Sequence, residues 1–242
     1  MSSSQARLAL LVDVFELQGQ QARVLPSIKP PELVEAILQE FRELEYLSDE
    51  PSAYYLVKAN DRTPLDDTVE IGRQQLGKEA RLILAEREEP IPENTHKLAQ
   101  RVYLREQSSG KVYRLHWQPA IIGRRAESQP RGEWVAVDLR PYPTGLRASR
   151  RHLTITEAKG QFYVENLAKN PAAILRNKDT IIAIDADKVL LQPDDIIWLE
   201  RSQISLKFIV RNGHNEKILD APEDETAAAI TTAPAARVPK DS

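Results

Sequence analysis

The spacing of apolar residues predicts a β-hairpin at the start of the chain. The segment from Leu8 to Leu17 is rich in Leu and Val and alternates between apolar and polar positions from Val12, which is typical of a strand. We expect a turn at Gln18-Gly19-Gln20 and a second strand from Ala22 to Leu25.

The spacing then changes to that of a helix. Pro30-Pro31 stands where proline is tolerated, at a helix start, and acidic residues follow in the first turn. Apolar residues recur at intervals of four, four and three, at Leu33, Ile37, Phe41 and Leu44. This pattern predicts a helix that runs to about Leu47 and ends before Pro51.

Two further strands are expected, from Tyr54 to Lys58 and from Arg81 to Ala85. The order strand-strand-helix-strand-strand describes a β-grasp. Residues 7–87 resemble ubiquitin-like domains, mainly in Leu65-Asp66-Asp67 and in the run Leu76-Gly77-Lys78-Glu79-Ala80-Arg81-Leu82-Ile83-Leu84. The chain continues through Glu86-Arg87 instead of ending in a free Gly-Gly, so the resemblance implies a docking module, not a conjugated modifier. Its nearest analogy is to small bacterial ubiquitin-like proteins of type VII-type secretion.

A different pattern follows a charged, proline-containing segment at 88–98, which we interpret as an exposed, mobile linker. Residues 99–212 hold many short apolar runs separated by turns, with no helical period, which predicts an all-β sandwich. The expected strands are 101–106, 111–117, 120–122, 134–139, 153–157, 162–166, 173–176, 180–184, 188–191, 195–200 and 204–210. Residues 1–6 are expected to be a flexible N-terminus, and 213–242, with little apolar bulk, a disordered tail.

Composition narrows the possible functions. The 242 residues carry a formal charge of -3, so the chain as a whole has no attraction to nucleic acid or anionic membrane. It contains no cysteine, which excludes disulfides, thiolate metal sites and cysteine nucleophiles. The apolar run that begins at Leu8 stops at Asp13, too short to insert into a membrane, and no signal-peptide cleavage pattern follows it. A cytoplasmic protein is the expectation.

Three short motifs in the second half stand in loops between predicted strands. Gly123-Arg124 follows an apolar run, Ser149-Arg150-Arg151-His152 precedes another, and Asn166-Leu167-Ala168-Lys169-Asn170 lies further along. In this order they resemble the phosphothreonine site of a forkhead-associated (FHA) domain, over about 99–212. The run Leu191-Gln192-Pro193-Asp194-Asp195 is similar to that family's leucine-x-proline-Gly-Asp ending, with Asp194 in place of glycine.

The residue types suit a phosphate, which has nearly two negative charges and three acceptor oxygens. The resemblance implies that Arg124 and Ser149 contact the phosphate, that Arg150 and Lys169 touch the phosphopeptide, and that Asn170 holds its main chain. Gly123 and His152 would support the site without contacting the ligand. The loop that ends in Asn170 is one residue shorter than is usual in the family, so the placement of Asn170 is the weakest part of the match.

Charge around these loops agrees with an acidic ligand. Seven arginines lie between Gly123 and His152, against Glu127, Glu133 and Asp138, which gives 7 − 3 = +4 in a chain of net charge -3. A local excess of this sign would steer an acidic partner toward the loops.

The predicted function is therefore a non-enzymatic adaptor that binds phosphothreonine segments of a partner protein or of a Ser/Thr kinase itself, in kinase signalling. The alternative is a phosphate-independent scaffold, docked through the ubiquitin-like domain to an unknown partner, such as a secretion-type complex. A hydrolase that uses Ser149 and His152 is the least favoured, because no orienting third group or oxyanion glycine pair accompanies them. No cofactor motif is present, the four histidines lack metal-ligand spacing, and no interleaved aromatics suggest nucleic acid.

Overall fold

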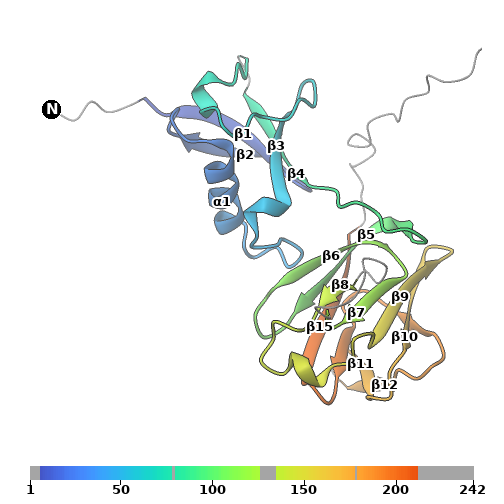
Figure 1. The fold of residues 1–242 in the computed structure, drawn as a ribbon. Helices are drawn as coiled ribbons and strands as arrows, with labels where there is room; N and C mark the ends of the chain where they lie inside the picture. The colour runs from blue at the N-terminus through green and yellow to red at the C-terminus, as the bar shows by residue number, and fades with distance from the viewer. Residues whose placement is uncertain (1–5, 78–79, 126–134, 178, 212–242) are drawn as a thin grey trace, which may run out of the picture.

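The structure is a computed structural model that describes residues 6–77, 80–125, 135–177 and 179–211. The expected N-terminal segment 1–6 lies outside these ranges except for Ala6, and the expected tail 213–242 lies wholly outside them. The described residues are mostly β-strand, with one α-helix. They form two units joined by the segment that follows Glu86 (Figure 1).

The N-terminal unit is a four-stranded sheet with a helix packed on it (Figure 1). Its elements are β1 (Leu8–Val14), β2 (Leu17–Val24), α1 (Pro30–Glu40), η1 (Pro51–Ala53), β3 (Tyr54–Lys58), η2 (Ile71–Arg73) and β4 (Arg81–Glu86). The strand order in this sheet is β2-β1-β4-β3. The two inner strands, β1 and β4, come from opposite ends of the unit's sequence and pair in parallel. Leu33, Val34 and Ile37 of α1 pack with strand residues in one core.

The hairpin turn is not where the sequence predicted it. β1 and β2 pair out to Val14 and Leu17, so the chain reverses at Phe15-Glu16, with Phe15 at a φ of 56°. Gly19 lies inside β2, where its N–H donates to Asp13 Oδ1 over 2.7 Å. A polar Gln-Gly-Gln run favours a turn, but the cross-strand pairing decided the register.

The helix is also shorter than predicted, since it ends at Glu40 and not near Leu47. Beyond it the chain makes successive tight turns, in which the N–H of Leu44 bonds to the carbonyl of Phe41 and the N–H of Leu47 to that of Leu44. Leu47 is still buried in the core. An apolar spacing of three persists through such turns, which explains why the pattern overestimated the helix.

The second unit is a β-sandwich of two sheets (Figure 1). Its described strands are β5 (His96–Glu106), β6 (Val112–Gln118), β7 (Ala120–Gly123), β8 (Val135–Asp138), β9 (Leu153–Ala158), β10 (Gln161–Asn166), β11 (Ala172–Arg176), β12 (Thr180–Ala183), β13 (Val189–Leu191), β14 (Ile196–Leu199) and β15 (Ile204–Arg211). One sheet has the order β13-β10-β9-β7-β8 and the other β12-β11-β14-β15-β5-β6. Each predicted strand is present to within a few residues, except that β5 starts at His96, inside the expected linker.

Buried side chains from both sheets form one core, including Leu104, Ile122, Leu153, Ile174 and Phe208. Asp195, in the turn between β13 and β14, is almost fully buried. Its carboxylate forms a two-point ion pair with the guanidinium of Arg176, with distances of 2.8 and 2.7 Å. Asp194, where glycine was expected, has a φ of 71°, a conformation that Asp tolerates better than most residues. The core therefore fixes the frame that carries the loops.

Candidate functional site

The three motifs meet at one end of the sandwich, joined by main-chain hydrogen bonds. The N–H of Arg124 donates to the carbonyl of Ser149 over 3.1 Å, and the N–H of His152 donates to the carbonyl of Ile122 over 2.9 Å. The N–H of Leu167 bonds in turn to the carbonyl of His152 over 2.9 Å. Segments far apart in the sequence are thus held as one group, which we call the loop site: Gly123, Arg124, Ser149, Arg150, His152, Lys169 and Asn170.

Gly123 allows this close approach. A Cβ atom at position 123 would lie 2.1 Å from the carbonyl oxygen of Arg150 and 2.9 Å from that of Ser149. Both neighbours are backbone atoms, so no side-chain rotation could relieve the contact. Glycine therefore brings the segment that carries Ser149 directly against the end of β7.

His152 is fully buried beneath the loops and bonds through both ring nitrogens. Its Nδ1 accepts from the N–H of Ser149 at 3.4 Å, so the Nε2 carries the proton and donates to the carbonyl of Asn170 at 3.2 Å. Burial lowers the pKa of His152, and the Asn170 carbonyl opposes that shift in part. A neutral imidazole thus links the Ser149 loop to the Asn170 loop.

Arg124 projects from the end of β7 with its guanidinium fixed at one point. Its Nε donates to the carbonyl of Ala148 over 3.0 Å, while its two terminal Nη groups have no acceptor in the described ranges. The side chain is half-buried. The two terminal nitrogens of a guanidinium can bind two oxygens of a phosphate or carboxylate, so the bond at Nε leaves a two-point anion contact available.

Asn170 connects the remaining loops through its carboxamide. Its Nδ2 donates to the carbonyl of Arg147 over 3.1 Å and lies 3.4 Å from Ser149 Oγ. Its backbone carbonyl accepts from Asn166 Nδ2 over 3.0 Å in addition to the imidazole. The short loop therefore does bring Asn170 beside Ser149. Arg150 and Lys169 are exposed at the same end, and no described residue pairs with their side chains.

One residue at this end of the sandwich was not predicted from the sequence. Arg201, in the turn between β14 and β15, donates from Nη1 to Asn170 Oδ1 over 3.1 Å. The turn reaches Asn170 because Leu199 pairs with Ala172 across the sheet. A lone arginine in a turn carries no motif, and only the strand order places it here.

Few carboxylates offset these cations. Asp138 is committed to the main chain, since its Oδ1 accepts from the N–H groups of Arg125 and Arg140 at 2.8 and 3.0 Å. Arg131, Glu127 and Glu133, which entered the predicted charge count, lie outside the described residues. Arg124, Arg150, Lys169 and Arg201 have no carboxylate within ion-pair distance in the part of the chain that the structure describes.

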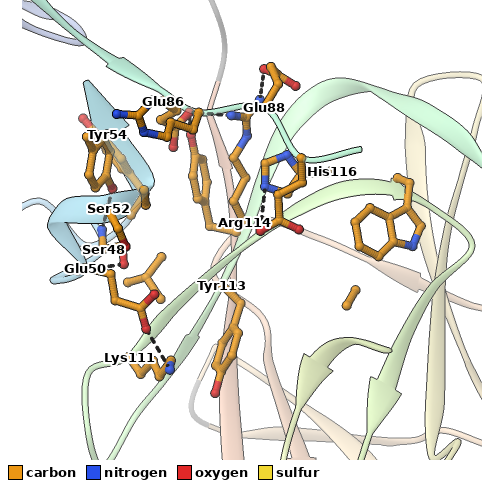
Figure 2. Close-up of a pocket in the computed structure, with 18 of the residues that line it drawn as sticks. Ser48, Glu50, Ser52, Tyr54, Glu86, Glu88, Lys111, Tyr113, Arg114 and His116 are labelled. Atoms are coloured by element: carbon orange, nitrogen blue, oxygen red, sulfur yellow. Dashed lines mark hydrogen bonds and ion pairs between the residues drawn. The ribbon is translucent and has the colours of Figure 1, made fainter. Parts of the chain in front are cut away.

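A second candidate is a cleft of about 440 Å³ where the two units meet. Its walls come from the segment before β3, the residues after β4, and β6 (Figure 2). Figure 2 shows that charged groups in its lining already pair with one another: Lys111 with Glu50 at 2.9 Å, and Arg114 with Glu88 at 2.7 Å. Two buried atoms, Arg114 Nη1 and His116 Nδ1, have no hydrogen-bond partner among the residues that the structure describes.

Beside this cleft, Glu86 joins the two units. It is 9 % exposed and accepts from Arg101 Nη1 at 2.7 Å and from Tyr103 Oη at 3.0 Å. Burial, reinforced by the Glu86 carboxylate, raises the pKa of Tyr103. From the end of β15, the Arg211 guanidinium lies 4.1 Å from the Phe15 ring centroid. The end of β4, directly before the expected linker, is therefore anchored to the sandwich.

Other chemistry finds little support in the described ranges. They contain no cluster of His, Cys, Asp or Glu that could hold a metal ion. None of their helices is both long and apolar enough to span a membrane. His152 does not act as a base for Ser149 in this arrangement, because both of its ring nitrogens bond to backbone groups and neither meets Ser149 Oγ.

Comparison with known proteins gives structural likenesses only. No family model matches this chain, and no curated protein matches it. Among solved structures, an FHA domain from a study of phosphothreonine-dependent FHA domain interactions is 20% identical over 46% of this chain and 98% of its own, with a TM-score of 0.34. The FHA domain of human APLF with an XRCC1 bisphospho peptide is 20% identical over 45% and 97%, with a TM-score of 0.34. An FHA domain from an Arabidopsis thaliana hypothetical protein is 17% identical over 51% and 97%, with a TM-score of 0.36.

Proposed function

We propose that this chain is a non-enzymatic adaptor whose sandwich is an FHA-type module that binds phosphothreonine segments through the loop site. The observation that carries the proposal is Arg124: its guanidinium is fixed at Nε by a backbone carbonyl, while both terminal nitrogens lack an acceptor in the described structure. Ser149 Oγ lies in the adjoining loop and can donate to a second oxygen of the same phosphate. The ligand would be a segment of a partner protein or of a Ser/Thr kinase.

The local charge supports an anionic ligand. Like-charged groups repel one another, so four cations gathered without acidic partners among the described residues raise the free energy of the empty site. A phosphate with a charge near −2 removes part of that repulsion when it binds. The proposal therefore accounts for a grouping of cations that folding alone would not favour.

For the N-terminal unit we propose a ubiquitin-like β-grasp that acts as a docking module. Its support is the order β2-β1-β4-β3 with a parallel central pair and one helix packed on the sheet. A scaffold that needs no phosphate remains the second candidate function. The anchoring of Glu86 favours it, because it would hold both docking surfaces in one arrangement.

The test is binding of a degenerate phosphothreonine peptide library and of its dephosphorylated counterpart, measured by fluorescence anisotropy on the full chain. Only the phosphorylated library is expected to bind. Arg124→Ala should lower affinity at least about tenfold, because a hydrogen bond to a charged group contributes roughly 1.5–3 kcal/mol. The variant loses the hydrogen bond from Arg124 Nε to the carbonyl of Ala148, so the free energy of unfolding should fall by only about 0.5–1.5 kcal/mol and the chain should stay folded.

Arg23→Ala is a matched control, because Arg23 is an exposed arginine on β2 in the other unit. It makes the same change in net charge far from the loop site and should leave affinity unchanged. Binding that survives dephosphorylation or Arg124→Ala would contradict the phosphothreonine proposal and favour the scaffold. Ester turnover that disappears in Ser149→Ala would instead establish an enzyme.

A further inference from the structure

We infer that Arg201 is a specificity-determining residue of the loop site, which selects phosphothreonine segments that carry a second anionic group. The inference rests on the proposed function and deepens it by naming the ligand class. It starts from the contact between Arg201 Nη1 and Asn170 Oδ1, at 3.1 Å.

That contact places a cation beside Asn170, whose carboxamide also meets the loop that carries Ser149. The Asn170 carboxamide points its Nδ2 toward Ser149 and Arg147 and its Oδ1 toward Arg201. A ligand whose phosphate sits at Arg124 and Ser149, and whose main chain crosses Asn170, therefore runs toward the turn between β14 and β15. Arg201 lies where another part of the same ligand would pass.

The Arg201 guanidinium is available to bind an anion. The side chain is exposed, and no carboxylate of a described residue lies within ion-pair distance of it, including that of its neighbour Glu200. A guanidinium offers five N–H donors, and the contact with Asn170 uses one of them. A neutral amide oxygen is also a weaker acceptor than a carboxylate or phosphate, so an anion can displace it.

Displacement would act on Asn170 as well. When Arg201 turns to a ligand anion, Asn170 Oδ1 loses its donor and can accept an N–H from the ligand main chain. The second anion thus contributes twice, through its own ion pair and through release of the Asn170 acceptor. A ligand with no second anion has to compete with Arg201 for the same oxygen. Arg201 should therefore help acidic ligands and give no help to neutral ones.

The experiment uses phosphothreonine peptides with an alanine-rich background and the full chain. One residue is varied at each position on both sides of the phosphothreonine, as glutamine, glutamate or a second phosphothreonine. We expect the acidic residue to raise affinity about threefold to tenfold over glutamine, at one position or at neighbouring positions on one side. Arg201→Gln should abolish that gain without lowering affinity for the glutamine peptides.

Two further variants separate this contact from general electrostatics. Arg201→Lys keeps the charge and should retain part of the gain, because lysine lacks the planar pair of donors. Arg23→Gln removes a distant charge and should retain all of it. A gain with glutamate and phosphothreonine alike identifies any anion as the second group, and a gain with phosphothreonine alone identifies a second phosphate.

The outcomes also distinguish failure of this inference from failure of the proposed function. If no phosphorylated peptide binds, or if binding does not depend on Arg124, the proposed function is wrong. If phosphopeptides bind through Arg124 but Arg201→Gln keeps the preference for an acidic residue, only the role of Arg201 is overturned. Equal loss for neutral and acidic peptides in Arg201→Gln would overturn it too, since that is the behaviour of a general charge effect.

Discussion

Two regions of this protein are rich in arginine, and they use it in opposite ways. Where the two units meet, Arg101 and Arg114 lie against Glu86, at 2.7 and 3.4 Å, and their side chains are 19% and 12% exposed. At the loop site, Arg124, Arg150 and Arg201 have no carboxylate within ion-pair distance in the described structure. Both regions gather positive charge, but among the described residues only the first region supplies acidic partners for it.

The difference separates charge that holds a structure from charge that is available to a ligand. Burying a charge costs free energy unless a partner of opposite sign is buried with it, which the Glu86 cluster provides. At the loop site the cations are reached by water, which stabilises them, and no carboxylate of a described residue offsets the repulsion between them. Substitutions should therefore reduce stability in the first region and affect ligand binding in the second.

The largest expected effect comes from Glu86→Ala, which would break the paired cluster. Removing the carboxylate takes away the buried counter-charge that Arg101 and Arg114 share and deprives Tyr103 Oη of its acceptor, while Arg114 keeps only its pair with the half-exposed Glu88 among the pairs described above. Loss of one partner of a buried ion pair costs roughly 3–5 kcal/mol, so we expect a change of that size in the free energy of unfolding, measured by urea titration. Phosphopeptide affinity should stay the same.

Glu88→Ala is the control for that experiment. Glu88 also pairs with Arg114, but its side chain is 51% exposed, so its removal should cost less than about 1 kcal/mol. Equal effects from the two substitutions would mean that burial does not distinguish the Glu86 cluster from surface pairing.

A second substitution tests whether the close backbone approach at Gly123 is needed for stability and for binding. Gly123→Ala would force the strand end and the Arg150 backbone apart, at a cost of roughly 1–3 kcal/mol. Because the displaced segment carries Ser149, phosphopeptide binding should be lost as well. Urea titration and peptide anisotropy measure the two effects.

The matched glycine is Gly160, which has a φ of 74° but, apart from its chain neighbours, no backbone atom within 4 Å of the position that an added Cβ would take. Gly160→Ala should cost about 1 kcal/mol through backbone strain and leave binding intact. Full binding by Gly123→Ala would show that the close approach is not needed for the site.

The third effect appears only at low pH and belongs to the region where the units meet. Burial, with Arg114 nearby, lowers the pKa of His116 to about 4, and Glu88 opposes the shift. The unfolded chain therefore takes up a proton near pH 6.5 that the folded protein resists, so stability is lost as pH falls from about 6.5 toward 4. The loss should reach roughly 2–3 kcal/mol.

Urea titrations of the wild type and of His116→Gln at pH 7 and pH 4.5 isolate this contribution, because all other titrating groups, His152 among them, are common to both. The wild type should lose more stability than the variant between the two pH values. Parallel losses would show that His116 is not held in its neutral form by the fold.

Some of the loop site could be predicted from the order of residues along the chain. The period of apolar residues located the strands on either side of each motif, and the sequence order of the motifs suggested a common end of a sandwich. The structure brings Arg124, Ser149 and Asn170 together and places Arg150 and Lys169 at the same end. Whether these residues bind a phosphopeptide stays a prediction until it is measured.

The residues that sequence reasoning missed depend on contacts between distant segments. Arg201 reaches Asn170 only because β14 pairs with β11, and Glu86 meets Arg101 only because the N-terminal unit packs against the sandwich. The same cause explains the misplaced hairpin turn, since strand pairing and not the local Gln-Gly-Gln composition set its position. Neither an arginine in a turn nor a glutamate at the end of a strand carries a local sequence pattern.

The sequence by itself determined the types and approximate limits of most elements, because alternation and apolar spacing reflect which face of each strand or helix is buried. It also determined the chemistry available in the loops, since residue type sets charge and hydrogen-bonding capacity. Only the tertiary structure decided which cations are paired and which are open to a ligand. Pairing depends on distances between segments far apart in the chain, and those distances are set by strand order and by how the two units pack.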